Sequence, residues 1–273
     1  MFARNRNVLY AVALLQGMVF YGPIATLYRQ ESGLTVFQIA LIESVFLALM
    51  LLMEIPWGVL ADRIGYRRTI VLCNLLFCLS KLVFWRADSF AAFLAERVLL
   101  AAVLSGLSGC ESAFLYLHAG SESPKKVFAI HSVMGTLGLL AAAASFSLFL
   151  SARLRLTALL TFGAYAAAFL LSLFLKDPPG KPEGNRRSMP PRALFRAVTA
   201  DGRFVCYLIG CAFLVEINQV VTVFLSQIQY AESGIPTRLL GYLYLLLTSA
   251  GVAAMGASSV GRRIGEPGLM LLA

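Results

Sequence analysis

The stretch GVLADRIGYRR, residues 58–68, decides the fold of this 273-residue chain, because it places several charges between two long apolar runs. It contains one acid, Asp62, and the bases Arg63, Arg67 and Arg68. The whole chain is 59% hydrophobic and 14% charged, whereas globular proteins are about 45–50% apolar and about 25% charged. A soluble core cannot hide so much apolar surface, so the composition predicts a membrane protein.

Apolar stretches long enough to cross a bilayer, which needs about 20 residues, occur throughout the chain. The first is longer than the apolar core of a signal peptide and lacks a cleavage site of small residues, so we expect it to be retained. The sequence therefore predicts an all-α, polytopic membrane protein with helices near residues 8–28, 36–60, 69–86, 90–117, 127–150, 154–175, 204–229 and 239–260.

The basic residues indicate how the chain is oriented and divided. Most of the 23 Lys and Arg residues fall in alternate loops, which predicts a cytoplasmic N-terminus. Residues 177–202 are rich in Pro, Gly and cations, and we expect them to form a cytoplasmic linker. This linker separates a six-helix transmembrane bundle, residues 1–176, from a partial second bundle, residues 203–273, which holds helices 7 and 8 and the start of helix 9.

Other classes of protein fit the sequence less well. The net charge of +9 could indicate nucleic acid, but the bases lie between apolar runs and form no single face, so no such partner is expected. The five cysteines lie inside apolar runs and form no C-x-x-C pair. The sequence therefore indicates no metal site, no cofactor and no disulfide framework.

Two short motifs recur in the same order in the second part of the chain. ESGL at residues 31–34 returns as ESGI at 232–235, and RIG at 63–65 returns at 263–265. Each ESG motif precedes the second helix of its half and each RIG motif follows that helix. The chain after the linker therefore repeats the plan of the chain before it.

The opening stretch resembles the loop signature that the major facilitator superfamily carries between its second and third helices. Tyr66 departs from that pattern, because the family usually has a base there. The resemblance implies two six-helix bundles that carry a small molecule by alternating access, with the substrate at their interface. It is carried by Gly58, Leu60, Ala61, Asp62, Arg63, Gly65, Arg67, Arg68 and Ile70.

Two further segments, EIPWG at 54–58 and GCESAFLY at 109–116, resemble efflux-type members of the family. They imply proton-coupled efflux. The fifth helix has Gly135 and Gly138 but lacks the Gly-Pro pattern of the drug and proton antiporters, which argues against antiport of that particular type.

The charged loop has a conformational and a purely topological interpretation. Gly58 would permit close helix approach, Gly65 would permit a tight turn, and Asp62 would pair with Arg63 or Arg68 in only one conformation. Alternatively, the bases only fix topology and bind anionic lipid heads. The switch residues that we expect on the first interpretation are Gly58, Asp62, Arg63, Gly65, Arg67 and Arg68.

Ionisable groups inside the helices are candidates for the substrate or proton pathway, because burying them in a bilayer costs about 2.5–3.5 kcal/mol each. The repeat offset brings Gln16 onto Glu216, so the two could face one cavity from opposite halves. The alternative is a structural hydrogen bond between helices. The pathway candidates are Gln16, Glu43, Arg97, Glu111, Glu216 and Asn218.

Helix periodicity predicts which of these ionisable groups lie on the same face of their helix. Arg97 and Glu111 share a face, and so do Glu43 and Glu54. Glu96 points about 100° away from Arg97, so no automatic ion pair is expected between them. Lys81 lies near a helix end, where we expect its side chain to reach towards the membrane surface. His118 and His131 flank a loop and are assigned no ligand role.

The sequence leaves two alternatives to an active transporter. The chain stops at Gly265–Ala273, where a ninth helix should begin, so it could be a fragment, or a truncated membrane protein with an interaction role. The G-x-S-G motif at 106–109 with His131 resembles a rhomboid protease, but eight spans with an internal repeat do not fit that family, so no enzyme is expected. We expect a monomer in the plasma or inner membrane whose partners are a small substrate, protons and lipid.

Overall fold

The structure is a computed structural model that describes residues 2–120, 122–177, 201–203, 205–207, 210, 221 and 225–249. Its described secondary structure is helical throughout, and residues 237–249 also form a helix. The named elements are α1 (Phe2–Gly17), η1 (Gly22–Ile24), α2 (Ala25–Glu31), α3 (Val36–Ile64), α4 (Tyr66–Arg86), α5 (Phe90–Leu117), α6 (Pro124–Ser145), the π-helical turn η2 (Phe146–Leu150), α7 (Leu154–Ser172) and α10 (Ser226–Glu232).

Six helical segments of the described chain are long and apolar enough to cross a membrane. They confirm the all-α polytopic class and the first six predicted spans. The seventh predicted span, 204–229, lies largely outside the described residues, and the eighth, 239–260, is described up to residue 249. The six segments are Phe2–Glu31, Val36–Glu54, Tyr66–Arg86, Phe90–Leu117, Pro124–Leu150 and Leu154–Ser172.

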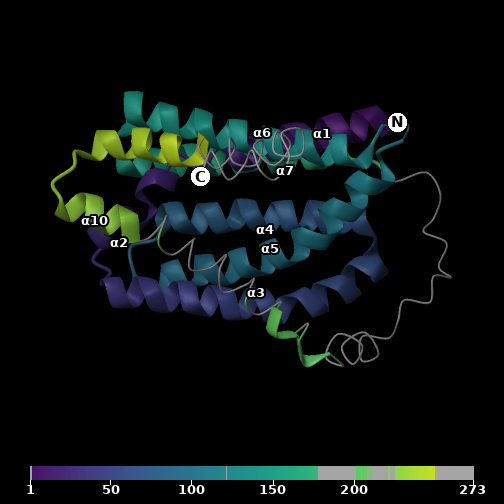
Figure 1. The fold of residues 1–273 in the computed structure, drawn as a ribbon, viewed down its shortest axis with the longest axis horizontal. Helices are drawn as coiled ribbons and strands as arrows, with labels where there is room; N and C mark the ends of the chain where they lie inside the picture. Colours follow the sequence, from purple (N-terminus) through teal and green to yellow (C-terminus); the bar gives the residue numbers. More distant parts are fainter. Residues whose placement is uncertain are drawn as a thin grey trace, which may run out of the picture.

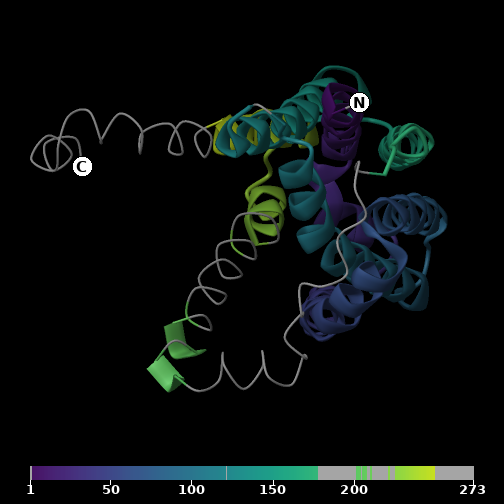
Figure 2. The same ribbon diagram turned by 90° about the vertical axis from the view of Figure 1, so that its right-hand side faces the viewer.

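The long helices lie side by side along the longest axis of the molecule (Figure 1). In the first half of the chain α4 packs on α5 and α7, α3 packs on α5, and α1 packs on α6 and α7. Seen from the end in Figure 2, α3, α4 and α5 form one group, with α1 and α6 beyond it. These contacts join the six spans into one bundle.

The first span is not one continuous helix, contrary to the sequence-based expectation. Its helical hydrogen bonding stops at Gly17 and resumes through η1 and α2. Around the break, Phe20 N–H donates to Thr161 Oγ1 at 3.0 Å, and Tyr165 Oη donates to the Gln16 carbonyl at 2.5 Å. Two side chains of α7 thus satisfy the backbone groups that the break frees, which a membrane interior requires.

Glycines bring α1 and α6 close together. A Cβ atom added at Gly17 would collide with the Gly135 carbonyl oxygen, and one at Gly138 would collide with the Leu14 carbonyl oxygen. Small residues at such positions let helix backbones approach each other, which is a principal source of packing between helices in a membrane. Gly135 and Gly138, which the sequence showed without a Gly-Pro pattern, thus serve the α1–α6 contact.

Candidate functional site

The charged stretch contains a tight turn between α3 and α4. Gly65 has a φ angle of +88°, in the region that side chains with a Cβ rarely adopt. Its N–H donates to the Ala61 carbonyl at 2.9 Å, and its carbonyl accepts from the backbone N–H of Thr69 at 3.1 Å. The tight turn expected at Gly65 is therefore present.

Arg67 ties this turn to the end of the sixth span. Its Nε donates to the Leu175 carbonyl at 2.7 Å, and its guanidinium lies 3.5 Å from the Asp177 carboxylate. Asp177 is exposed, so the ion pair is weak and the backbone contact is the firmer link. The start of α4 thus holds the point where the chain leaves the first bundle.

The other charges of the stretch point outwards. Asp62, Arg63 and Arg68 are exposed, and none of them has a hydrogen bond or ion pair among the described residues. The pairing of Asp62 with Arg63 or Arg68 is thus not formed in this conformation, and its role as a switch remains a prediction.

A cavity of about 390 Å³ lies beside these residues, between α3 and α5. Glu54 and Asp62 place two carboxylates at its wall, together with the rings of Trp57 and Tyr66. Gly58 also lines it, and a Cβ added there would meet no heavy atom within 4 Å. The prediction that Gly58 serves close helix packing is therefore wrong for the described part of the chain: it borders a space.

Ser108, the serine of the G-x-S-G motif, lies on the same cavity wall. Its hydroxyl donates to the Ser105 carbonyl at 3.3 Å, the usual back-bond of a helical serine. Among the described residues His131 makes no hydrogen bond to it. The arrangement offers no activated nucleophile.

A buried ionic network lies towards the other end of the bundle. A single oxygen of Glu43, on α3, accepts from Arg29 of α2 at 2.9 Å and from Arg97 of α5 at 2.7 Å. Arg29 is fully buried, with its guanidinium 5.9 Å from the centre of the Phe84 ring. Glu43 and Arg97 keep 12% and 15% of their side chains exposed, so the network has one accessible edge.

Glu96 holds the interior side of the same network. It is fully buried on α5, 3.5 Å from the Lys81 ammonium of α4 and 3.9 Å from the Arg29 guanidinium. Lys81 also donates to Tyr21 Oη at 3.0 Å. We call Arg29, Glu43, Lys81, Glu96 and Arg97 the ionic network; it joins four helical elements and carries three cations against two carboxylates.

The network corrects three sequence-based expectations. Lys81 is only 4% exposed and does not reach for the membrane surface, because Glu96 and Tyr21 satisfy it inside the bundle. Glu96 and Arg97 do interact, at 3.7 Å, since the long arginine side chain reaches around the helix. Arg29, which falls just outside the predicted helix 8–28, lies at the centre of the network.

Gln16 makes a second polar contact in the middle of the bundle. Its Nε2 donates to Asn74 Oδ1 at 2.9 Å, and Asn74 in turn donates to the Ile70 carbonyl at 2.9 Å. This hydrogen bond joins α1 to α4. Glu216 and Asn218 lie outside the described residues, so the predicted pairing of Gln16 with Glu216 is untested.

The remaining pathway candidates are not joined to the ionic network by any contact among the described residues. Glu111 is half-buried, and its buried Oε1 has no hydrogen-bond partner in the described chain. Glu54, expected to share a face with Glu43, lines the α3–α5 cavity, and Glu43 contacts Arg97 of the same helix α5. The structure thus divides the candidates between the two ends of the bundle.

A polar cluster closes the bundle end near the turn. His118, just past α5, is fully buried, and its Nδ1 lies 2.8 Å from the Phe114 carbonyl, so this nitrogen carries the hydrogen. Its Nε2 can then accept from Asn5 Nδ2, 2.8 Å away. Asn5 also donates to the Lys176 carbonyl at 2.8 Å. Burial lowers the pKa of His118, and the Phe114 hydrogen bond opposes that shift.

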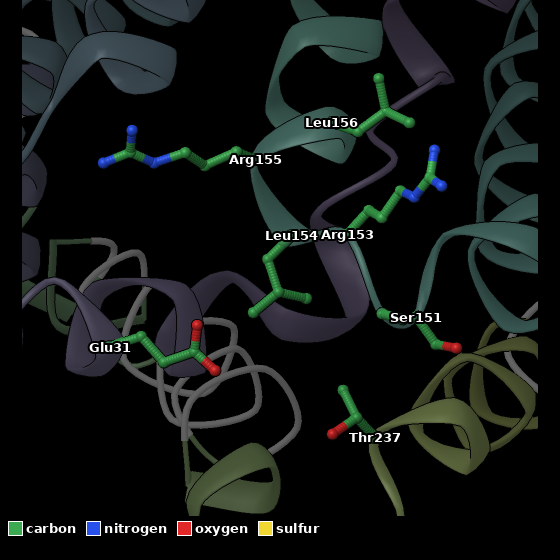
Figure 3. Close-up of a pocket in the computed structure, with 8 residues that line it drawn as sticks. Glu31, Ser151, Arg153, Leu154, Arg155, Leu156 and Thr237 are labelled. Atoms are coloured by element: carbon green, nitrogen blue, oxygen red, sulfur yellow. The ribbon is translucent and has the colours of Figure 1, made fainter.

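A larger cavity, of about 470 Å³, lies at the opposite end (Figure 3). It is bordered by Glu31, by Arg153 and Arg155 at the start of α7, and by Thr237 of the second half. Figure 3 shows the two arginine side chains extending in different directions. They do not converge on a common ligand position, and the cavity marks a junction between the halves of the chain.

Sequence reasoning missed Tyr21, Arg29 and Asn74 as members of the polar contacts. Asn74 is a polar residue in the middle of an apolar run, which is a usable signal. Gly22-Pro23 signals a helix interruption, and with it a bend that turns Arg29 inwards.

The sequence of the chain matches the Major Facilitator Superfamily over residues 8–273. The chain therefore belongs to this family of membrane transporters, which confirms the resemblance seen in the charged loop. It is a secondary transporter by family and not an enzyme. No curated protein matches the sequence significantly.

Solved structures with a similar fold include two of a nucleoside transporter. The crystal structure of the nucleoside transporter NupG matches with a TM-score of 0.72 and 15% identity, over 95% of this chain and 68% of that one. The D323A mutant of NupG matches with a TM-score of 0.71 and 16% identity, over 95% and 69%. At these identities the similarity establishes the shared fold.

Proposed function

We propose that this transporter moves a small molecule by alternating access, coupled to protons, in the direction of efflux. The observation that carries the proposal is the ionic network, whose accessible edge consists of Glu43 and Arg97. Charges inside a transporter bundle are expensive and commonly mark substrate or proton pathways.

Proton coupling would act through Glu43. One of its oxygens binds both Arg29 and Arg97, so protonation of this carboxyl weakens two ion pairs at once. Arg97 would then be free to bind a substrate group or to repel a cation. We further propose Gln16 and Glu111 as polar groups along the path, with Glu216 and Asn218 contributed by the second half.

The charged turn would act as the conformational switch. The support is that Arg67 binds the end of the sixth span while Asp62 remains unpaired beside a cavity, both within the described chain. We expect Asp62→Asn to lower transport at least tenfold with unchanged membrane abundance, because an unpaired acid adds little to folding. Full activity of this variant would contradict the switching role.

The decisive experiment is flux through the purified chain in proteoliposomes under an imposed pH gradient. Uridine is one probe, since NupG is a nucleoside transporter, and ethidium is a probe for efflux. We expect gradient-driven movement of one probe that Glu43→Gln uncouples from pH, whereas Glu232→Gln, an exposed acid of α10, leaves it unchanged. Equal pH dependence of both variants would refute proton coupling through Glu43.

The organisation proposed for the whole chain is a first bundle at 1–176, a cytoplasmic linker at 177–202 and part of a second bundle at 203–273. Packing of the six described spans on each other supports the first of these. A cytoplasmic N-terminus, the plasma or inner membrane and a monomeric state complete the proposal. Protease protection of a tag at either end would test the orientation.

A further inference from the structure

At two places in the first span, a backbone N–H does not bond the carbonyl four residues earlier. In a continuous helix, each N–H donates to the carbonyl four residues earlier, so Phe20 would bond Gln16 and Thr26 would bond Gly22. The first pair is satisfied by Thr161 and Tyr165 of α7, inside the same bundle. The second pair is satisfied from the other half of the chain.

Gln227 of α10 fills the second break. Thr26 N–H donates to its Oε1 at 2.9 Å, and its Nε2 donates to the Gly22 carbonyl at 3.0 Å. The carboxamide therefore occupies the place of one helical hydrogen bond, using a donor and an acceptor as a peptide group would. Gln227 is 3% exposed and Thr26 is fully buried, so the contact is closed to water.

A second contact supports the same arrangement. Arg238 Nε donates to the Ser147 carbonyl at 3.1 Å, within the π-helical turn η2. Ile24, Phe146 and Leu240 belong to one apolar cluster, which places both contacts at the same end of the bundle. In Figure 1 α10 lies beside α2, and the helix at 237–249 lies along α6. The second half thus docks where the helices of the first half are irregular.

We propose that the contact of Gln227 with Thr26 and Gly22 closes this end of the transporter and breaks when the two halves separate. We call this contact the seal. When the halves separate, the carboxamide leaves, and the Thr26 N–H and the Gly22 carbonyl bond each other, which extends α2 by part of a turn. Opening then leaves neither backbone group unsatisfied, which lowers its cost in a membrane. The break at Gln16 has no such freedom, because its partners move with it.

This inference rests on the alternating access of the proposed function, but its test requires no transport. The probe is Thr26→Cys in a chain whose native cysteines are replaced by serine, reconstituted in nanodiscs and labelled with a water-soluble maleimide. The buried position reacts only when the seal opens. The test variant is Gln227→Glu, and the matched control is Gln229→Glu, an exposed glutamine on the same helix.

Protonation decides whether a glutamate can replace the amide. A protonated carboxyl offers one donor and one acceptor, whereas a carboxylate only accepts and faces the Gly22 carbonyl without a hydrogen. Burial at residue 227 disfavours the charged form of a carboxyl. We therefore expect the labelling rate of Gln227→Glu, divided by that of Gln229→Glu at the same pH, to be near one at about pH 5. At about pH 8 the ratio should rise about tenfold, equivalent to about 1.4 kcal/mol.

Because the ratio compares two variants at each pH, the pH dependence of the maleimide reaction cancels. Reversible change of the ratio in one preparation also excludes misfolding as the cause. A ratio that does not change with pH, whether low or high throughout, would overturn the seal. If the proteoliposome experiment shows no flux but the labelling ratio still depends on pH, the proposed function is contradicted and the seal is not.

Discussion

Replacing Glu96 by glutamine removes one of the two carboxylates from the ionic network. In the parent chain Glu96 is fully buried and lies within 4 Å of Lys81, Arg29 and Arg97. After Glu96→Gln, the three cations face the single carboxylate of Glu43. Breaking a buried ion pair by removing one partner costs about 3–5 kcal/mol, because the remaining charge stays buried without compensation.

The expected loss translates into a thermal shift. For chains of this size about 1 kcal/mol lowers the Tm by roughly 2–4 °C, so Glu96→Gln should lower it by roughly 6–20 °C. Thermal unfolding in detergent, followed by tryptophan fluorescence, measures the shift. Glu31→Gln, which removes an exposed acid at the end of α2, should move the Tm by less than about 2 °C.

A second substitution identifies the cause. Lys81→Met removes the cation that lies 3.5 Å from Glu96, so combining it with Glu96→Gln should recover part of the lost stability. Interaction energies between residues in contact reach about 0.5–3 kcal/mol in such cycles. A Tm for Glu96→Gln equal to that of Glu31→Gln, or strictly additive effects with Lys81→Met, would refute a stabilising network.

Two further predictions concern packing and pH. Gly138→Val should destabilise the bundle by about 1–3 kcal/mol, because its Cβ would collide with the Leu14 carbonyl; Gly163→Val, whose Cβ meets nothing within 4 Å, is the control, and equal Tm values would contradict the α1–α6 contact. The pKa of His118 is lowered in the folded chain, so the unfolded state binds the proton more readily and stability should fall as pH drops below about 6.5. His118→Gln should reduce the Tm difference between about pH 7.5 and about pH 5.5, and an unchanged difference would show that other groups cause it.

The sequence predicted the features that are determined by the residues of a single contiguous segment. Apolar run length located the six described spans, and Gly65 fell where the turn needs a positive φ angle. The signature around Asp62 indicated the family because it is a contiguous pattern. Each of these inferences needs only local geometry and the thickness of a bilayer.

The site depended on how separate helices face each other, and periodicity within one helix cannot supply that. Lys81 was assigned to the membrane surface because its partner, Glu96, lies on another helix. Arg29 falls outside the predicted helix 8–28, because the sequence-based prediction did not include the break at Gly22-Pro23 that lets α2 turn inwards. No ion pair was expected between Glu96 and Arg97, because neighbouring residues of a helix point about 100° apart. That angle describes the directions of the Cβ atoms, whereas the ends of long side chains can still meet.

Gly58 illustrates a different limit. A small residue beside a helix end is compatible with close packing and equally with the wall of a cavity. Only the positions of α3 and α5 distinguish the two, and they place Gly58 on the cavity.

Reciprocal accessibility of the two ends is the most direct sign of alternating access. Alternating access requires that opening the Gln227 end closes the opposite one. Labelling of Thr26→Cys reports the first end, and labelling of Ala113→Cys, on the wall of the α3–α5 cavity, reports the other. Each rate is divided by that of the Gln229→Glu chain with the same cysteine at the same pH. On raising the pH we expect this ratio for Gln227→Glu to rise at residue 26 and to fall at residue 113; a ratio that rises at both would indicate a loosened bundle and contradict alternating access.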